Sequence, residues 1–334
     1  MMRAEQTGHF FDESVLMRVM YSSDNRTSGV RYNALTPKLA LQLAAPHTWA
    51  ASVFPSLFGI LYCIYRSFGI SAIEAALLLS ACVLMQAAVN TFNDYMDFVK
   101  GTDSLEDNLE KEDAVLLYAG VDPHQVRNLA FAFLGTAALI GIGFTVKSGP
   151  LPLAIGLLGG LIVLLYSGGP LPISYLPIGE ITSGVVMGAL IPLGITAAVT
   201  GKFHPEILPL TLPLVTGIGL IMMTNNTCDI EKDLKAGRRT FSGCIGRKKA
   251  VRVYRLAVIL WMLLIALDGA LLGRAPLTVA LLGVFAAYIP AYRFLMRSPL
   301  LQSTRVAQMK GILKANICSG IVCLAILLAA IAVR

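Results

Sequence analysis

Two groups of asparagine and aspartate residues are the part of this 334-residue chain best suited to chemistry. The first group closes one long apolar stretch and consists of Asn90, Asn93, Asp94 and Asp97. The second closes another apolar stretch and consists of Asn225, Asn226, Asp229 and Asp233. Spacings of three and four residues put each group on one face of a helix. Polar residues at the ends of membrane helices are costly and usually functional.

Two such faces aimed at one cavity predict a magnesium site for a diphosphate substrate. Mg²⁺ binds through carboxylates, water and substrate phosphates, and it neutralises a leaving group as a Lewis acid. The predicted metal ligands are Asp94, Asp97, Asp229 and Asp233, with Asn90 and Asn225 as neutral oxygen ligands. The predicted substrate contacts from the same groups are Asn90, Asn93 and Asn226.

Basic residues follow the second group directly. Lys232, Lys235, Arg238 and Arg239 can stabilise the charge of a departing diphosphate. The alternative is that they are cytoplasmic loop charges that set membrane orientation.

The composition indicates an integral membrane protein. Mean hydropathy is +0.69, and 14% of residues are charged, against about 25% in soluble domains. The six cysteines and four histidines have no metal-binding spacing. The net charge of +7 is ascribed to membrane orientation rather than to nucleic-acid binding.

The apolar pattern predicts an all-α fold with nine transmembrane helices in one bundle. Each of nine stretches is long enough to span a bilayer, and they lie near 47–66, 72–95, 125–146, 150–167, 179–200, 205–226, 251–273, 276–294 and 311–333. Residues 1–39 are polar and are expected to form a cytoplasmic tail, which leaves 40–334 as the membrane domain. Helices 2 and 6 both end in an Asp-rich group, which suggests two four-helix pseudo-repeats plus a ninth helix.

The basic residues predict how this bundle is oriented. With the N-terminus in the cytoplasm, 22 of the 27 lysines and arginines fall on the cytoplasmic side. Both Asp-rich groups then face the cytoplasm, in a multi-pass protein of the inner or plasma membrane.

These motifs resemble the UbiA-type membrane prenyltransferase superfamily, whose hallmark is a pair of Asp-rich motifs on nine membrane helices. The resemblance runs from about Leu35 to the C-terminus. The branch that the chain resembles most is the 1,4-dihydroxy-2-naphthoate polyprenyltransferases of menaquinone synthesis. Three stretches carry that likeness: Asn93-Asp94-Tyr95-x-Asp97 with Gly101-x-Asp103, Asn225-Asn226-x-x-Asp229-Ile230-Glu231-x-Asp233 with Gly237-Arg238-Arg239-Thr240, and Tyr166-Ser167-Gly168-Gly169-Pro170 followed by Gly179-Glu180.

The resemblance implies Mg²⁺-dependent transfer of a polyprenyl group from polyprenyl diphosphate to an aromatic acceptor. Tyr95 and Tyr166 would shape the acceptor pocket or stabilise the allylic cation, or else belong to an interfacial aromatic belt. Glu180 would position or deprotonate the acceptor phenol, or else interact with a helix dipole. His47, at the start of the first helix, is a further substrate-binding candidate.

The sequence leaves two alternatives open, one for the acceptor and one for the class of protein. The acceptor could be 4-hydroxybenzoate or another aromatic or prenyl acceptor. The protein could instead be a cation-coupled transporter, but transport carboxylates should lie near the midplane of the membrane, and these lie at helix ends.

Overall fold

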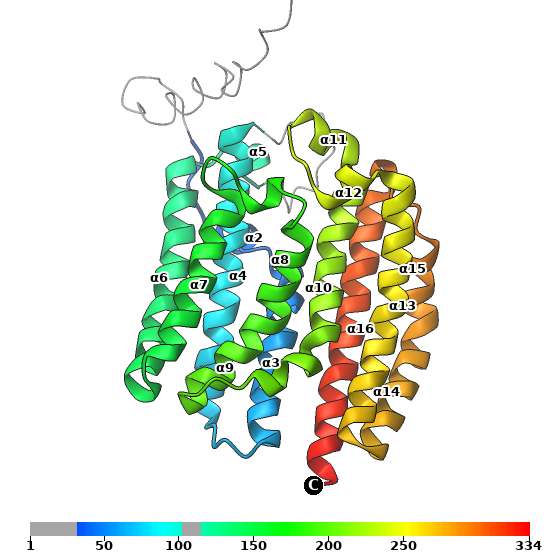
Figure 1. Cartoon of the computed structure of the whole chain (residues 1–334). Coiled ribbons are helices and arrows are strands. Elements are labelled where there is room, and N and C mark those ends of the chain that lie inside the picture. Colours follow the sequence, from blue (N-terminus) through cyan, green and yellow to red (C-terminus); the bar gives the residue numbers. More distant parts are fainter. Residues whose placement is uncertain (1–31, 102–114) are drawn as a thin grey trace, which may run out of the picture.

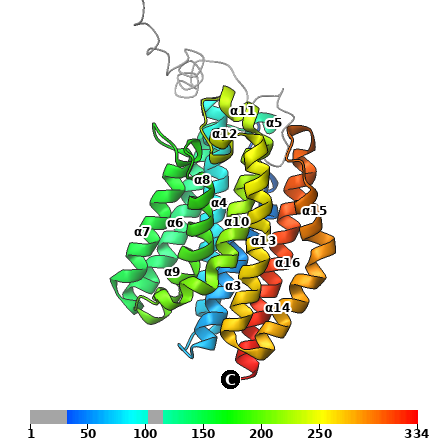
Figure 2. The ribbon, with the colours of Figure 1, turned by 45° about the vertical axis from the view of Figure 1, so that its right-hand side comes forward.

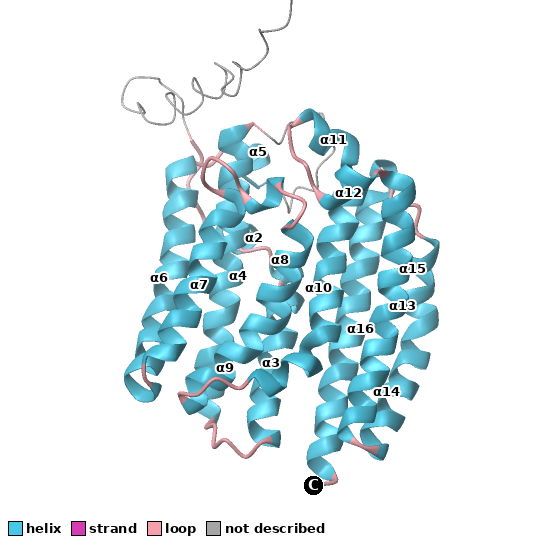
Figure 3. Cartoon of the chain, in the orientation of Figure 1, coloured by secondary structure: helices cyan, strands magenta, loops and turns pink. Residues whose placement is uncertain are grey.

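The chain folds into a bundle of long helices (Figures 1 and 3). The structure is a computed structural model that describes residues 32–101 and 115–334. In those parts the secondary structure is helical, apart from one isolated bridge between Asn33 and Val121. The long helices are α3 (Ala50–Tyr65), α4 (Ala72–Lys100), α6 (Pro123–Ser148), α7 (Pro150–Ser167), α10 (Leu208–Cys228), α13 (Arg247–Leu272), α14 (Arg274–Ala287) and α16 (Arg305–Ala332).

Shorter elements complete or connect these helices. They are α2 (Pro37–Leu43), η1 (Pro46–Thr48), α5 (Val115–Ala119), η3 (Ile173–Tyr175), α8 (Gly179–Val185), η4 (Val186–Leu190), α9 (Ile191–Thr200), η5 (Pro205–Ile207), α11 (Ile230–Lys235), α12 (Phe241–Ile245), η6 (Tyr288–Tyr292), α15 (Arg293–Arg297) and η7 (Gln302–Thr304). The predicted domain boundary between residues 39 and 40 lies inside α2. Residues 1–31 of the predicted tail, and Asp103, lie outside the described residues.

Within the described residues, eight helical runs are long and apolar enough to cross a membrane. They are Ala72–Lys100, Pro123–Ser148, Pro150–Ser167, Gly179–Thr200, Pro205–Cys228, Arg247–Leu272, Arg274–Arg297 and Gln302–Ala332. Each matches one of the predicted intervals. The first predicted interval, 47–66, is not among these eight runs, because Pro37–Thr48 and Ala50–Tyr65 meet there at a 65° bend. The number of spans is therefore eight, or nine if this bent pair is one crossing.

Helix α4 carries the first Asp-rich group and is defined clearly at both ends. Ser71 accepts from the backbone N–H of Glu74, and the Glu74 carboxylate accepts from the backbone N–H of Ser71, which together form a capping box. The helix ends at Gly101, whose φ of 66° lies in the left-handed region that glycine favours. Its last turn extends beyond the predicted end at residue 95, so the whole first group is helical.

Both Asp-rich groups lie at the same end of the bundle. The ends of α4 and α10 lie at the upper end in Figure 1, beneath α5, α11 and α12, and the C-terminus lies at the opposite end in both Figures 1 and 2. This arrangement agrees with the prediction that the two groups share one side of the membrane.

Two glycines bring α8 and η4 against the backbone of α10. A Cβ at Gly184 would lie 2.5 Å from the carbonyl oxygen of Val215, and one at Gly188 would lie 2.4 Å from the Val215 nitrogen. Only glycine therefore allows so close a contact at these two positions. The contact places Glu180, in the first turn of α8, beside the Asn226 region of α10.

Candidate active site

The first Asp-rich group does not act as a single face, because its four polar side chains divide into two pairs. Asn90 donates to the Ala44 carbonyl at 3.1 Å and to the Thr48 hydroxyl at 2.9 Å. Asp94 accepts from the backbone N–H groups of Val115 and Leu116 at 2.8 and 3.2 Å. These residues hold α2, η1 and the N-terminus of α5 against α4.

The second pair of this group turns towards α7. The Asn93 amide donates to Asp97 at 2.9 Å, and the Ser167 hydroxyl donates to the Asn93 side-chain oxygen. Lys100, one turn beyond Asp97, donates to the Ser167 carbonyl at 2.8 Å. The end of α4 is therefore joined to the end of α7, close to Tyr166.

The second Asp-rich group lies across a helix break. Helix α10 ends at Cys228, Asp229 has φ −101° and ψ 17°, and α11 begins at Ile230. The predicted continuous helix is therefore wrong at Asp229, although its N–H still donates to the Asn225 carbonyl at 3.1 Å. Arg247 bonds the Thr227 and Cys228 carbonyls at 2.6 and 3.5 Å, which satisfies acceptors that the break exposes.

The members of this group also divide into two pairs. Arg305, at the start of α16, donates to Asp229 at 2.9 Å and to Asn225 at 2.8 Å. Asn226 instead donates to Glu180 at 2.9 Å, and Asp233 forms an ion pair with Arg238 at 3.5 Å. In the second group, Asn225 and Asp229 are thus bound by Arg305, while Asn226 and Asp233 contact Glu180 and Arg238.

Arg238 connects the two groups electrostatically. Burial lowers its pKa, but Asp233 and then Asp97 outweigh burial and leave the pKa of Arg238 raised. Tyr166 and Tyr175 act on Arg238 in the same direction. Burial raises the pKa of Asp233 to about 6, although Arg238 opposes this shift.

Five buried polar atoms in this region have no hydrogen-bond partner. They are Tyr166 Oη, Glu180 Oε2, Asn226 Oδ1, Asp233 Oδ2 and Arg238 Nε. A buried polar atom without a partner costs about 1–3 kcal/mol, so five in one region are not explained by packing. They include donors, acceptors and both signs of charge, which fits a polar, charged ligand. We call these five residues the central cluster.

The predicted six-residue metal cage is not assembled among the described residues. No three carboxylate, imidazole or thiolate groups in residues 32–101 and 115–334 are placed to hold a metal ion. The donors nonetheless fit a metal that arrives with a phosphate ligand, since Mg²⁺ is usually held by one or two carboxylates plus substrate phosphates. Asp233 offers an unpartnered buried oxygen for such a metal, and Asp97 acts electrostatically on the same Arg238 as Asp233 does.

The remaining predicted residues have varied positions. Tyr95 packs with the apolar residues of α2 and α5 and stacks on Phe92 with centroids 6.1 Å apart, outside the central cluster. His47 is an exposed residue of η1. Lys232 lies within electrostatic range of Asp229 and Asp233. Arg239 has an exposed side chain, while its backbone N–H donates to the Tyr175 carbonyl at 2.9 Å.

Sequence reasoning missed three residues of this region, namely Lys100, Tyr175 and Arg305. In the sequence, Lys100 and Arg305 are only two of the basic residues that predict the membrane orientation. Their contacts with Ser167 and Asp229 depend on packing between segments far apart in the chain. The spacing of Lys100, three residues after Asp97, was the one available signal.

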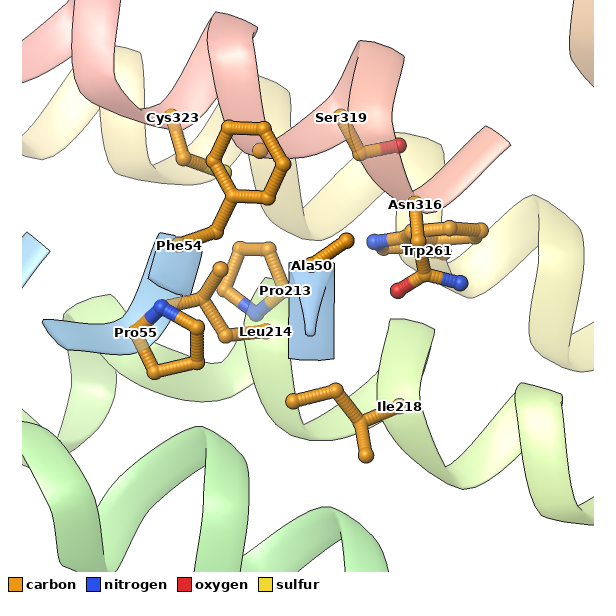
Figure 4. A pocket seen from close by; sticks show the side chains of 11 residues that line it. Ala50, Phe54, Pro55, Pro213, Leu214, Ile218, Trp261, Asn316, Ser319 and Cys323 are labelled. Atoms are coloured by element: carbon orange, nitrogen blue, oxygen red, sulfur yellow. The ribbon is translucent and has the colours of Figure 1, made fainter. Parts of the chain in front are cut away.

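A small apolar pocket lies deeper in the bundle, between α3, α10, α13 and α16 (Figure 4). Its lining includes Phe54, Pro213, Ile218, Trp261 and Asn316. Ile218 lies on α10 seven residues before Asn225, or about 10 Å along the helix. The pocket is therefore placed beneath the Asp-rich groups and inside the membrane-spanning part of the bundle.

Comparisons with known proteins agree with this architecture. A sequence model of the UbiA prenyltransferase family matches residues 52–312. A 1,4-dihydroxy-2-naphthoate octaprenyltransferase from Bacillus subtilis is 34% identical over 232 residues, which cover 69% of this chain and 74% of that protein. A protein of the same name from Mycobacterium tuberculosis is 27% identical over 217 residues, covering 62% of this chain and 72% of that protein.

Solved structures share the fold. A UbiA homolog from Archaeoglobus fulgidus, bound to DMAPP and Mg²⁺, superposes with a TM-score of 0.58 at 16% identity, covering 88% of this chain and 99% of that one. A structure described as digeranylgeranylglyceryl phosphate synthase superposes with the same TM-score at 21% identity, covering 88% of this chain and 98% of that one. With the family match extending over most of the sequence, the chain belongs to the UbiA prenyltransferase family and is a membrane-embedded prenyltransferase.

Proposed function

We propose that this prenyltransferase transfers a polyprenyl group from polyprenyl diphosphate to 1,4-dihydroxy-2-naphthoate, with Mg²⁺ at the diphosphate, in menaquinone biosynthesis. The observation that carries this proposal is the central cluster, whose five unpartnered polar atoms include two from the second Asp-rich group. The names of the Bacillus and Mycobacterium relatives support the choice of acceptor, and the Archaeoglobus homolog solved with DMAPP and Mg²⁺ supports the choice of donor and metal.

The diphosphate and metal belong on the Arg238 side of the cluster. Asp97 and Asp233 would hold Mg²⁺ directly, and Mg²⁺ supplies charge neutralisation for the leaving group when bound. Asp94, Asp229, Asn90 and Asn225 now contact α5, Arg305 and η1, so each would exchange a present partner to join the metal. Arg238 would stabilise the departing diphosphate through its unpartnered Nε, with Lys232 and Arg239 as further positive charges.

The acceptor belongs on the Glu180 side. Asn226 fixes one carboxylate oxygen of Glu180 and leaves Oε2 unpartnered. That oxygen can accept the proton of an acceptor phenol, while Tyr166 Oη supplies a second hydrogen bond. In the reaction, the allylic C–O bond to the diphosphate breaks and a C–C bond to the aromatic ring forms. The ring carboxylate leaves as CO₂, and Glu180 returns the proton to the phenolate oxygen to give the naphthoquinol. His47 and Tyr95 stay predictions as substrate-binding residues.

The polyprenyl tail belongs in the apolar interior. The pocket lined by Phe54, Ile218 and Trp261 lies beneath the second Asp-rich group, and its side chains would have to move apart to admit the first apolar units. We further propose that the bent pair Pro37–Thr48 and Ala50–Tyr65 is one crossing, which makes nine, arranged as two four-helix units plus α16. The charge distribution supports an N-terminus and an active site on the cytoplasmic side, and the membrane that we propose is the inner or plasma membrane.

The main alternative within this function is a 4-hydroxybenzoate-type acceptor. The test is to incubate purified protein with a polyprenyl diphosphate and equal amounts of both aromatic acids, and to identify lipid products by mass spectrometry. We expect a prenylated naphthoquinol that has lost CO₂. Prenylated 4-hydroxybenzoate as the main product would overturn the acceptor assignment and leave the family assignment intact.

The role of Glu180 is tested in the same assay. Glu180→Gln should lower turnover while the KM for polyprenyl diphosphate stays nearly unchanged, since its expected partner is the acceptor. Glu206→Gln is the matched control, because Glu206 pairs with Arg66 and His204 in a group that does not include the central cluster. Equal turnover by Glu180→Gln and Glu206→Gln would contradict the acceptor role.

A further inference from the structure

Tyr175 occupies a position where three separate segments meet. It ends η3, in the connection between α7 and α8. The Lys100 ammonium, at the end of α4, lies 5.0 Å from the centroid of its ring. The Arg238 guanidinium, from the connection between α11 and α12, lies 5.4 Å from the same centroid. One aromatic ring thus contacts a cation from the region of each Asp-rich group.

These two cations would not be expected to approach each other without a partner between them. Lys100 lies within electrostatic range of both Asp97 and Arg238. Asp97 attracts its ammonium group, and Arg238 repels it. An aromatic face attracts a cation through its quadrupole and carries no net charge. The Tyr175 ring can therefore stabilise both cations without adding a negative charge that would compete with an anionic ligand.

Other contacts fix the ring relative to the site. The Arg239 N–H donates to the Tyr175 carbonyl at 2.9 Å, which ties η3 to the connection after α11. Lys100 donates to the Ser167 carbonyl at 2.8 Å, next to Tyr166 of the central cluster. Arg238 keeps its buried Nε unpartnered although it contacts both Tyr175 and Asp233. The cation pair is thus held in place at the border of the central cluster.

We propose that Tyr175 is a positioning residue for the prenyl diphosphate, whose ring holds Lys100 and Arg238 as a pair of cations that bind the diphosphate across the two Asp-rich groups. This inference rests on the proposed function, in which the diphosphate lies on the Arg238 side. It adds Lys100 as a diphosphate contact and gives the connection between α7 and α8 a role in donor binding. The aromatic acid, which is also an anion, is assigned to Glu180 and Tyr166 and not to this pair.

The test compares Tyr175→Leu with Tyr175→Phe, which keeps the aromatic face and removes the hydroxyl. Tyr65→Leu is the matched control, because the Arg334 guanidinium lies 5.3 Å from the Tyr65 ring centroid in a second cation–π contact away from the cluster. For each variant, kcat and the KM values for polyprenyl diphosphate and for the aromatic acid are measured. Binding of inorganic diphosphate with Mg²⁺ is measured by calorimetry on the detergent-solubilised protein.

Tyr175→Leu should raise the KM for polyprenyl diphosphate and the Kd for inorganic diphosphate by about tenfold, as expected for the loss of two cation–π contacts. Tyr175→Phe and Tyr65→Leu should stay near wild type, as should the KM for the aromatic acid in all three variants. Adding Lys100→Met to Tyr175→Leu should cost much less than Lys100→Met alone costs in the wild type.

Three results would overturn the proposal: unchanged diphosphate binding in Tyr175→Leu, an equal defect in Tyr175→Phe, or a rise confined to the KM for the aromatic acid. The calorimetric measurement needs no turnover. A wild-type protein that binds diphosphate but forms no naphthoate product would therefore refute the acceptor assignment while the Tyr175 comparison still stands.

Discussion

At the scale of single residues, the candidate site is marked by buried polar atoms that have no hydrogen-bond partner. Glu180, Asn226 and Asp233 are 6%, 3% and 3% exposed, yet each keeps one unpartnered oxygen. Asp94 and Asp229 are equally buried, but α5 and Arg305 satisfy them. Burial therefore does not separate the carboxylates that we assign to the substrates from those with structural partners, whereas hydrogen-bond satisfaction does.

This distinction leads to a prediction for the two neighbouring arginines. Arg238 pairs with Asp233 and has an unpartnered Nε, while the Arg239 side chain is exposed. Arg238→Met should lower kcat/KM for polyprenyl diphosphate roughly 10- to 150-fold, since a hydrogen bond to a charged group contributes about 1.5–3 kcal/mol. Arg239→Met should lower it by less than about threefold, as for an exposed ion pair. Steady-state kinetics check both, and equal effects would refute the distinction.

At the scale of elements, short helices at one end of the bundle depend on the Asp-rich groups for their attachment. Asp94 accepts from the first two N–H groups of α5, and the Leu116 side chain of α5 is 1% exposed. Arg305 similarly attaches the start of α16 to Asn225 and Asp229. The residues predicted to bind metal therefore also hold the helices that border the site.

The contact of Asp94 with α5 predicts a loss of stability that needs no metal. Asp94→Ala should lower the free energy of unfolding by about 0.5–2 kcal/mol, the usual cost of replacing a capping Asp by Ala. The measurement is thermal unfolding in detergent with EDTA present. Asp122→Ala, which removes the carboxylate that accepts from the His124 N–H at 2.9 Å, should destabilise α6 similarly but leave activity intact. An unchanged midpoint for Asp94→Ala in EDTA would show that Asp94 is not a structural cap.

The sequence predicted the elements better than it predicted their contacts. Length and apolar composition located the spans, and the spacing of Asn93 and Asp97 correctly placed both on one helix face. Spacing could not show that Asn90 and Asp94 turn to η1 and α5, because that depends on segments 21 to 46 residues away in the chain. Likewise, the break at Asp229 is satisfied by Arg247 and Arg305, which come from other helices and carry no local signal.

At the scale of the whole molecule, two halves of the chain meet at one end of the bundle to build one site. The first half supplies α4, α7 and α8, and the second supplies α10 and α11. The Tyr175–Arg238 contact and the Glu180–Asn226 hydrogen bond join them. Neither half contains the central cluster alone.

This arrangement predicts the topology of the chain in the membrane. Reporters inserted at Gly120 and at Thr240 should lie on the same side, and the charge distribution predicts the cytoplasm. Reporters at Lys202 and at the C-terminus should lie on the other side. Three membrane spans separate Lys202 from Gly120, and three separate the C-terminus from Thr240. Labelling of single cysteines at these positions in intact cells measures this. Labelling of positions 120 and 240 from opposite sides would contradict a shared site.

The most direct test of the whole account is the formation of lipid product by wild type and by Asp233→Asn, each with Mg²⁺ or with excess EDTA. The substrates are a polyprenyl diphosphate and 1,4-dihydroxy-2-naphthoate, and the readout is mass spectrometry of the extracted lipids. Glu231→Gln, on the same short helix but paired with Arg247, is the matched control. We predict product from wild type and Glu231→Gln with Mg²⁺, none with EDTA, and a loss of about 100-fold or more in Asp233→Asn. Full turnover by Asp233→Asn, or by wild type in EDTA, would contradict a metal-bound diphosphate at the central cluster.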